Sequence, residues 1–307
     1  MDCIAIFGAN GRIGAPLGLQ LVRNAPYTKL RLISSRVEQA RSLNASFPTA
    51  EVCIADYFGL DSLQAALDGV NGVFVITPHF LDEKLAMSNL VSVLAGSDKL
   101  ELLIRVVGYH PGSHLLDIPP ALRDFGPGVA TQHFVAQAIL EASGLPATFL
   151  NLGASMMDNF LKNAPLRSRS TLVWHPRLIP YVDPRDVAEA ASTMFLSSKE
   201  HVGKTYHLNN NHDLRRGEDV ASLMTRIAGK SIAFDGSRSA YLTMASERIR
   251  RDFGIEGGAE YLWDFFEYER SIESHWTLDP TLKQLLGRQP TTLSQWIAEN
   301  RTRLFTV

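Results

Sequence analysis

The sequence predicts an α/β protein with a parallel sheet that helices cover on both faces. Through the first 150 residues, short apolar runs alternate with segments long enough for helices. The runs show no alternating polar face, which is typical of strands buried on both sides in a parallel sheet. A glycine-rich turn directly follows the first run. These three observations predict a doubly wound, Rossmann-type α/β fold, followed by a smaller and mostly helical region.

The individual elements are placed by these runs and by the residues that end helices. Strands are expected at Cys3–Phe7, Leu30–Ser34, Glu51–Ala55, Gly72–Ile76, Leu102–Val107 and Ala147–Leu150. Helices are expected between them, at Arg12–Asn24, Val37–Ser46, Leu60–Leu67, Leu81–Leu94 and Val129–Ala142. Gly69, Gly96 and Gly144 stand shortly after three of these helices, where glycine commonly ends a helix.

The pattern becomes less regular after Leu150. Asp183-Pro184 is a helix-start signal for Val187–Leu196. Further expected elements are a strand at Lys204–Leu208, a helix at Gly217–Ala228, a strand at Ser231–Phe234 and mostly helix from Ser237 onward. We therefore expect a Rossmann-type domain over residues 1–153 and a C-terminal region over residues 154–307. That region is expected to pack on the first domain and can return segments to the main sheet.

The composition restricts the partners that the protein can have. Of the 307 residues, 45% are hydrophobic and 20% are charged, which supports a packed core. The net charge of −2 disfavours nucleic acid, whose phosphates attract a basic surface. No apolar run reaches the roughly 18 residues of a membrane span, and the N-terminus lacks the features of a secretory signal. A cytoplasmic protein with no nucleic-acid or membrane partner is expected.

The cysteines and histidines predict neither a disulfide nor a metal site. Cys3 and Cys53 lie in apolar strand-like runs, where buried and unreactive thiols are expected. His110 and His114 have the spacing of metal ligands, but Pro111-Gly112 between them disfavours a helix that presents both rings on one side. No metal is therefore expected.

The glycine-rich turn has the features of a dinucleotide site. The first strand runs directly into Gly8-Ala9-Asn10-Gly11-Arg12-Ile13-Gly14, and a helical segment follows. Gly8 permits a tight turn, Gly11 allows the backbone to approach a pyrophosphate, and Gly14 allows the helix to pack closely on the strand. The start of that helix then offers free N–H groups to the phosphates. The whole turn, including Asn10, Arg12 and Ile13, is expected to contact a cofactor.

The end of the second strand predicts which dinucleotide binds. An NAD site places Asp or Glu there to hold the ribose 2′-hydroxyl. This sequence instead has Ser35-Arg36, and a guanidinium pairs well with a 2′-phosphate. The expected cofactor is therefore NADP(H), with Arg12 able to reach the same phosphate. A solvated surface Arg36 is the alternative.

Two further strand ends face the same expected site. Asp56 follows the third strand and can either accept from the adenine amino group or cap the next turn. Thr77-Pro78 follows the fourth strand, at the carboxyl edge of the sheet where ligands of doubly wound folds bind.

Several segments together resemble one protein family. These are Gly8–Gly14, Arg36, Ala55-Asp56, Ser62–Val70, Val73–Pro78 and Gly144–Thr148. They resemble the NmrA-like atypical short-chain dehydrogenases, a group with triphenylmethane reductases, type 2 NADPH:quinone oxidoreductases, ergot-alkaloid iminium reductases and NmrA redox sensors. The resemblance extends from the first strand to about Gly229. It implies a Rossmann fold and NADP(H), and does not specify the reaction.

The usual catalytic pair of the wider superfamily is missing. None of the tyrosines is followed by a Lys four residues later, so the Tyr-x-x-x-Lys proton donor does not occur. In the resemblance, His133 occupies the position at which related reductases carry Lys or His, eleven residues before Gly144. His133 could donate a proton or a hydrogen bond, with Gln137 one turn further along the same helix. A structural histidine is the equally weighted alternative.

The resemblance also suggests where the substrate pocket begins. The segment Asn151–Asn159 follows the sixth strand, and in the family this region borders the nicotinamide, which places Gly153 beside the cofactor. Met156, Met157 and Tyr109 are candidate pocket residues, although the methionines suit core packing equally well. Tyr261, Phe265 and Tyr268 share one helical face, which predicts core packing first and a pocket lid second.

Two functions remain open. The first is an NADPH-dependent oxidoreductase that transfers hydride to an iminium, a quinone or a similar conjugated or cationic small molecule, by positioning rather than by acid catalysis. The second is a non-enzymatic NADP(H) sensor that regulates a partner protein. A homo-oligomer is compatible with either.

Overall fold

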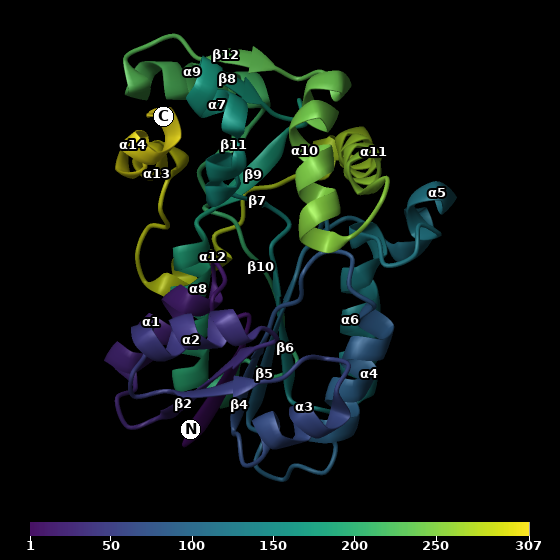
Figure 1. Ribbon diagram of the computed structural model, residues 1–307, viewed down its shortest axis with the longest axis vertical. Helices are drawn as coiled ribbons and strands as arrows, with labels where there is room; N and C mark the ends of the chain where they lie inside the picture. Colours follow the sequence, from purple (N-terminus) through teal and green to yellow (C-terminus); the bar gives the residue numbers. More distant parts are fainter. Residues whose placement is uncertain (307) are drawn as a thin grey trace. The chain divides into compact units, whose positions relative to one another are not determined.

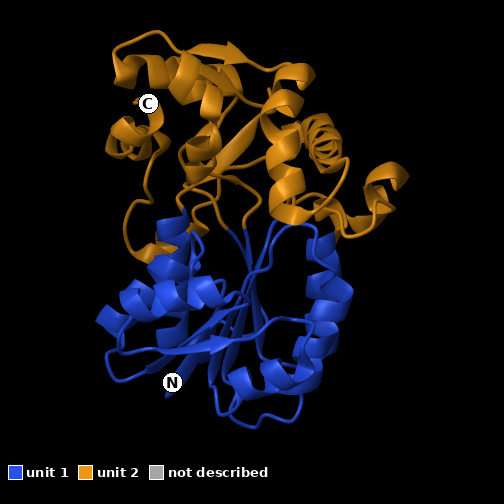
Figure 2. Ribbon diagram, viewed as in Figure 1, with its two compact units in different colours: residues 1–108, 132–151, 184–207 blue, residues 109–131, 152–183, 208–307 orange. Residues whose placement is uncertain are grey.

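The computed structural model describes residues 1–306, and this part of the chain divides into two compact units (Figure 2). Unit 1 contains residues 1–108, 132–151 and 184–207, and unit 2 contains residues 109–131, 152–183 and 208–306. The two units have nearly the same length. The chain thus passes from one unit to the other several times, rather than once near residue 153.

Unit 1 is built on a parallel sheet with the strand order β10-β6-β5-β4-β1-β2-β3. Its strands are β1 (Cys3–Phe7), β2 (Lys29–Ser34), β3 (Glu51–Ile54), β4 (Gly72–Val75), β5 (Leu102–Val107), β6 (Ala147–Asn151) and β10 (Thr205–His207). Every pair of neighbouring strands in this sheet is parallel. The order reverses between β1 and β4, which is the switch point of a doubly wound fold. The predicted fold class is confirmed.

Helices cover both faces of this sheet. They are α1 (Gly14–Asn24), α2 (Val37–Ser46), α3 (Leu60–Leu67), α4 (Glu83–Leu94), α6 (Val129–Ala142) and α8 (Pro184–Leu196). Figure 1 shows α1, α2 and α8 on one face and α3, α4 and α6 on the other. Helix α1 packs against the alanine-rich α8, and its buried Gly18 leaves room for the ring of Phe47, which a Cβ there would meet at 3.0 Å. The predicted start of α4 at Leu81 is corrected to Glu83, because Asp82 caps the helix by accepting from the N–H of Leu85.

The strands of unit 1 form its core. Every residue of β1, β4 and β5 is buried, as the apolar runs predicted. The exception to their apolar character is Arg105 in β5, whose side chain is fully buried. Cys3 is buried as expected, whereas Cys53 is only partly buried; both thiols are free, and burial raises the pKa of each.

Unit 2 combines short strands with helices around a separate core. Its strands are β7 (Ser155–Met156), β8 (Thr171–Val173), β9 (Ile179–Val182), β11 (Leu214–Arg215) and β12 (Ala233–Asp235). Its helices are α5 (Pro120–Arg123), α7 (Ala164–Arg169), α9 (Gly217–Ala228), α10 (Arg238–Phe253), α11 (Gly258–Ser271), α12 (Thr281–Leu286), α13 (Leu293–Glu299) and α14 (Arg301–Phe305), with short 3-10 turns at Leu115–Asp117 and Met157–Lys162. The sequence predicted α9, the helical C-terminal part and, with the strand expected at Ser231–Phe234, part of β12, but missed β7, β8, β9 and β11. Strands of two to four residues are too short to show a period.

No helix in residues 1–306 is long and apolar enough to span a membrane.

Candidate functional site

The loop after β1 needs glycine at three positions, because a side chain at any of them would clash with neighbouring atoms. Gly8 has a φ of +66°, and a side chain there would also meet Ile76, with its Cβ 2.6 Å from Cγ2. The N–H of Gly11 donates to the carbonyl of Gly8 over 2.7 Å, and a Cβ at Gly11 would lie 2.8 Å from that oxygen. A Cβ at Gly14 would overlap the same oxygen. The loop therefore closes tightly on itself, and the backbone at Gly8 and Gly11 remains exposed.

The start of α1 is suited to an anion. No side chain caps the helix at Ile13, and its first turn contains no acidic residue, so nothing there competes with a bound phosphate. Ile13 is buried and anchors the turn, and Arg12 is partly exposed beside it. Asn10 donates from its Nδ2 to the carbonyl of Gln39 over 3.0 Å, which ties the loop to α2.

Arg36 lies at the start of α2, immediately after β2. Ser34 fixes its backbone, because the Ser34 hydroxyl donates to the Arg36 carbonyl over 3.1 Å and accepts from the Arg36 N–H over 3.2 Å. The guanidinium is exposed, and within residues 1–306 it forms no ion pair. Arg31, on the same strand, is instead neutralised by Glu51 over 2.8 Å. A fixed backbone with an unpaired guanidinium suits recognition of a phosphate.

Asp56 performs the capping role that was one of its two predicted uses. Its Oδ1 accepts from the N–H groups of Phe58 and Gly59 over 2.7 and 2.9 Å, before α3 begins. This turn holds the exposed carboxylate at the end of β3.

Thr77 and Pro78 lie just past β4 in a buried polar network that the sequence analysis missed. Arg105 donates from NH2 to the Thr77 hydroxyl over 2.7 Å and to Glu83 Oε1 over 2.8 Å. Thr77 itself donates to Glu83 Oε1. Gln132 donates to the same Glu83 oxygen over 3.2 Å and to the carbonyl of Pro78 over 3.3 Å. We call Thr77, Glu83, Arg105 and Gln132 the Arg105 network. A charged residue inside the apolar run Leu102–Val107 was the signal that could have revealed it.

Several buried atoms in and beside the Arg105 network have no hydrogen-bond partner among the described residues. Within the described chain, Glu83 Oε2, Arg105 Nε and His133 Nδ1 are buried and accept or donate no hydrogen bond. His133 follows Gln132 on α6. Burial first, and then the positive charges of Arg105 and His79, lower the pKa of His133 well below its usual range. The imidazole is therefore neutral at neutral pH and can hydrogen-bond but is not a cationic acid.

The other predicted pocket residues are divided between the two units, with Gln137 in unit 1 and Tyr109, Met156 and Met157 in unit 2. Gln137 donates to Glu141 over 2.7 Å and to the Thr205 hydroxyl at the start of β10 over 3.4 Å. Met157 is fully buried in the core of unit 2, so of its two predicted roles it has that of a core residue. Met156 is partly exposed in β7. Gly153 is required by packing in unit 2, because a Cβ there would lie 2.7 Å from the carbonyl oxygen of the partly exposed Tyr109.

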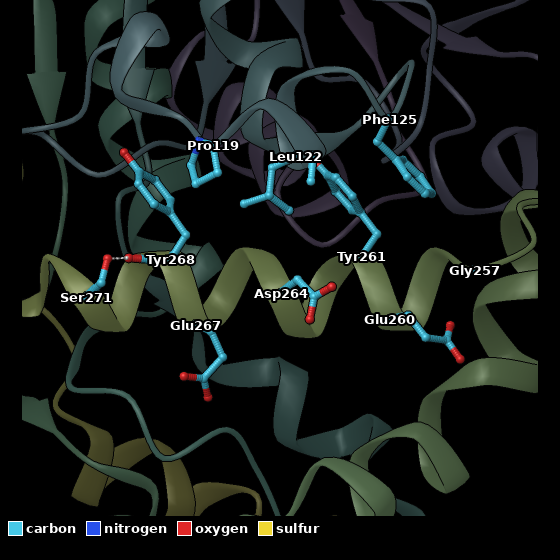
Figure 3. Close-up of a pocket in the computed structure, with 11 residues that line it drawn as sticks. Pro119, Leu122, Phe125, Gly257, Glu260, Tyr261, Asp264, Glu267, Tyr268 and Ser271 are labelled. Atoms are coloured by element: carbon cyan, nitrogen blue, oxygen red, sulfur yellow. Dashed lines mark hydrogen bonds between the residues drawn. The ribbon is translucent and has the colours of Figure 1, made fainter.

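Unit 2 contains a pocket of about 540 Å³ between α11 and the segment around α5 (Figure 3). Tyr261 and Tyr268 form one wall with Leu122 and Phe125, and Phe265 is not part of it. The ring of Tyr261 stacks on Phe125 at 4.2 Å, and its hydroxyl accepts from the N–H of Ala130 over 2.9 Å. Two of the residues with the predicted shared face on α11 thus line a pocket.

The rim of this pocket is acidic. Glu260, Asp264 and Glu267 line it from α11, and no Lys or Arg is among its lining residues in the described chain. Figure 3 shows Glu260 and Glu267 on the side of α11 opposite the tyrosine rings, and Asp264 on the side toward the viewer. Glu267 is bound by His175 over 2.9 Å, whereas no described residue pairs with Glu260 or Asp264. The pocket is therefore apolar inside and negatively charged at its edge.

Comparison with protein-family models finds no match, and neither does comparison with curated proteins. Solved structures do show similar folds. The triphenylmethane reductase of Citrobacter sp., solved with NADP(H), is 21% identical, with a TM-score of 0.75 over 97% of this chain and 99% of that chain. An NADPH-dependent quinone oxidoreductase from Escherichia coli is 22% identical, with a TM-score of 0.73 over 96% and 98%. NmrA, a negative transcriptional regulator solved with NADP, is 17% identical, with a TM-score of 0.73 over 97% and 94%.

Proteins of other activity share the same fold. A nucleoside-diphosphate-sugar epimerase from Staphylococcus aureus is 19% identical, with a TM-score of 0.77 over 97% of this chain and all of that chain. At such identities the likeness shows the fold and not the reaction. The resemblance that the sequence motifs indicated is confirmed at this level: over nearly its whole length, the chain has the Rossmann-type fold of the NmrA-like reductases and regulators.

Proposed function

We propose that the protein is an NADP(H)-binding oxidoreductase that delivers hydride to a conjugated or cationic small molecule. The observation that carries the cofactor assignment is Arg36, an unpaired and exposed guanidinium held at the end of β2, where an NAD site would have a carboxylate. Structural neighbours solved with NADP(H), or described as NADPH-dependent, support the same cofactor.

The described residues fit this cofactor. The backbone at Gly8 and Gly11 is bare because side chains there would meet Ile76 or the loop itself, so a pyrophosphate can approach it. The uncapped start of α1 offers N–H donors, and Arg36 would hold the 2′-phosphate. Thr77 and Pro78 lie beyond the switch point, on the half of the sheet that would receive the nicotinamide.

The chain supplies little acid catalysis. When bound, NADPH would supply the hydride. No Tyr-x-x-x-Lys pair occurs, and burial beside Arg105 keeps the pKa of His133 low, so His133 would orient a ligand by hydrogen bonding rather than protonate it. The protein would then act mainly by holding the reactants in place, which suits acceptors that are already electrophilic.

The pocket of unit 2 favours a cationic aromatic acceptor within this class. Aromatic walls attract cations through their ring faces, and unpaired Glu260 and Asp264 add negative charge at the edge. We propose that the apolar body of the acceptor binds against Tyr261 and Tyr268. A neutral quinone would gain nothing from the carboxylates.

A non-enzymatic NADP(H) sensor is the second candidate. It is favoured by the neutral His133, because the predicted site then has no cationic acid. A sensor must bind NADPH and NADP⁺ with different affinity, or present a different surface in each form.

Calorimetric titration with NADPH, NADP⁺ and NADH tests the cofactor proposal first. We expect NADPH to bind at least tenfold more tightly than NADH. Stopped-flow oxidation of bound NADPH by a cationic triphenylmethane dye, an iminium compound and a quinone then tests the reaction, and turnover should be fastest with the cations. Glu260→Gln/Asp264→Asn should raise KM for the cationic acceptor about threefold at low salt, with a smaller effect at high salt. NADPH binding without any turnover would favour the sensor.

A further inference from the structure

The Arg105 network has a feature that stability alone does not explain. Arg105 and Glu83 form an ion pair with side-chain exposures of 0% and 2%, and Arg105 is the one charged residue of an otherwise apolar strand. Bringing two charges out of water is unfavourable, and an apolar pair of similar size commonly stabilises a core as well or better. Arg105 Nε and Glu83 Oε2 are moreover left without hydrogen bonds among the described residues. The arrangement therefore suggests a role in fixing geometry.

The network fixes the chain segment Thr77–Phe80 from several sides. Arg105 holds the Thr77 hydroxyl, and Gln132 accepts from the N–H of Phe80 over 3.3 Å while donating to the carbonyl of Pro78. Phe80 has a φ of +62°, in the left-handed region that bulky residues rarely adopt. Such a conformation persists only where its surroundings enforce it.

The held segment lies where a cofactor's second half would bind. In a doubly wound sheet, the two mononucleotide halves of the ligand lie on opposite sides of the switch point. Gly8–Gly14 and Arg36 follow β1 and β2 on one side, whereas Thr77 follows β4 on the other. The segment Thr77–Phe80 thus belongs to the nicotinamide side, and the first helix after it begins with Glu83 itself.

We propose that Arg105 is a positioning residue for nicotinamide: through Glu83, Thr77 and Gln132 it holds Thr77–Phe80 and the neighbouring turn of α6 in the conformation that receives that ring. This inference rests on the proposed function. It assigns Arg105 no contact with the cofactor. The positive charge next to His133 is a second consequence, since it helps to keep that imidazole neutral.

The test compares the binding of NADPH with the binding of a fragment that lacks the nicotinamide half. The variant Arg105→Met/Glu83→Gln removes both buried charges together, which avoids leaving one of them unpaired. Calorimetry would measure Kd for NADPH and for 2′,5′-ADP, which carries the 2′-phosphate but no nicotinamide. We expect Kd for NADPH to rise at least tenfold and Kd for 2′,5′-ADP to change less than twofold. The single variant Arg105→Lys keeps the buried positive charge, so its Kd for NADPH should rise less than that of the double variant.

A matched control exists in unit 2. Arg177 and Glu269 form another buried ion pair over 2.9 Å, and Arg177→Met/Glu269→Gln should leave both Kd values unchanged. If the network double variant does not fold, Thr77→Val removes the two hydrogen bonds that the Thr77 hydroxyl forms with Arg105 and Glu83 while keeping the shape of the side chain, and should raise Kd for NADPH alone about fivefold.

The outcomes separate the two proposals. A wild-type protein that binds neither NADPH nor 2′,5′-ADP refutes the proposed cofactor. A wild-type protein that binds both, with a network variant that weakens both equally or neither, overturns the positioning role of Arg105 and leaves the cofactor assignment intact.

Discussion

The two ends of the proposed cofactor site are built in opposite ways. Around Gly11 and Arg36 the backbone and the guanidinium are exposed, and no described residue neutralises that charge. Around Thr77 the charged groups are buried and neutralise one another, with Arg105 and Glu83 2.8 Å apart. An exposed, unpaired charge can contribute to ligand affinity, whereas a buried and paired one contributes to shape. We therefore expect the first end to set how tightly a dinucleotide binds, and the second to set where its reactive ring lies.

The largest effect should come from the glycine loop. In Gly11→Val, the new Cβ would press against the Gly8 carbonyl oxygen, and the side chain would cover the backbone that approaches the phosphates. We expect Kd for NADPH and for 2′,5′-ADP to rise at least a hundredfold by calorimetry. Gly96→Ala is the matched control, since a Cβ there meets no neighbour within 4 Å. Unchanged binding in Gly11→Val would move the site away from this loop.

A smaller effect is expected from Arg36→Ala. Loss of the guanidinium should weaken NADPH binding by about 1.4 to 2.7 kcal/mol, or ten- to a hundredfold in Kd. NADH, which has no 2′-phosphate, should bind within twofold of the wild type. Arg23→Ala, at the far end of α1, serves as the control. Equal losses for both dinucleotides would show that Arg36 does not read the 2′-phosphate.

The smallest effect is the contribution of His133, at the buried end, to the pH dependence of stability. Because burial lowers the pKa of His133, the folded protein binds no proton there, while the unfolded chain binds one below its ordinary pKa near 6.5. The stability contribution is complete above that pH and decreases as the pH falls, by up to about 1.4 kcal/mol per pH unit. In urea unfolding at pH 8, 6 and 5, His133→Gln should lose less stability on acidification than the wild type. The exposed His114→Gln is the control, and identical acid profiles for wild type and His133→Gln would contradict the prediction.

The exposed end could be predicted from the sequence because its causes are local. The spacing of Gly8, Gly11 and Gly14 reflects contacts within the loop itself or with the end of the adjacent β4, and Arg36 is visible two residues after β2. The buried end could not be predicted in the same way. Arg105, Glu83 and Gln132 are far apart in the chain and meet only after β4, β5, α4 and α6 have packed.

Unit 2 shows the same limit for the fold. Its long helices have enough turns to display an apolar face, whereas β8 and β9 contain only a few residues and β9 includes Pro180. Met157 could be assigned by type to either a pocket wall or a core, and only its complete burial distinguishes the two. Segments whose structure depends on distant partners carry little local signal.

The path of the chain has a consequence for synthesis. Strand β10 pairs with β6 at the edge of the main sheet, and α8 packs on α1, but both follow a stretch of unit 2 that precedes them in the sequence. On a ribosome, the glycine-rich loop Gly8–Gly14 emerges among the first residues, yet the sheet that supports it is complete only after His207 has left the exit tunnel. A nascent chain that ends near residue 153 would expose β6 as an unpaired edge and leave α1 uncovered. We therefore expect unit 1 to complete its folding only after the second half of the protein has been synthesised.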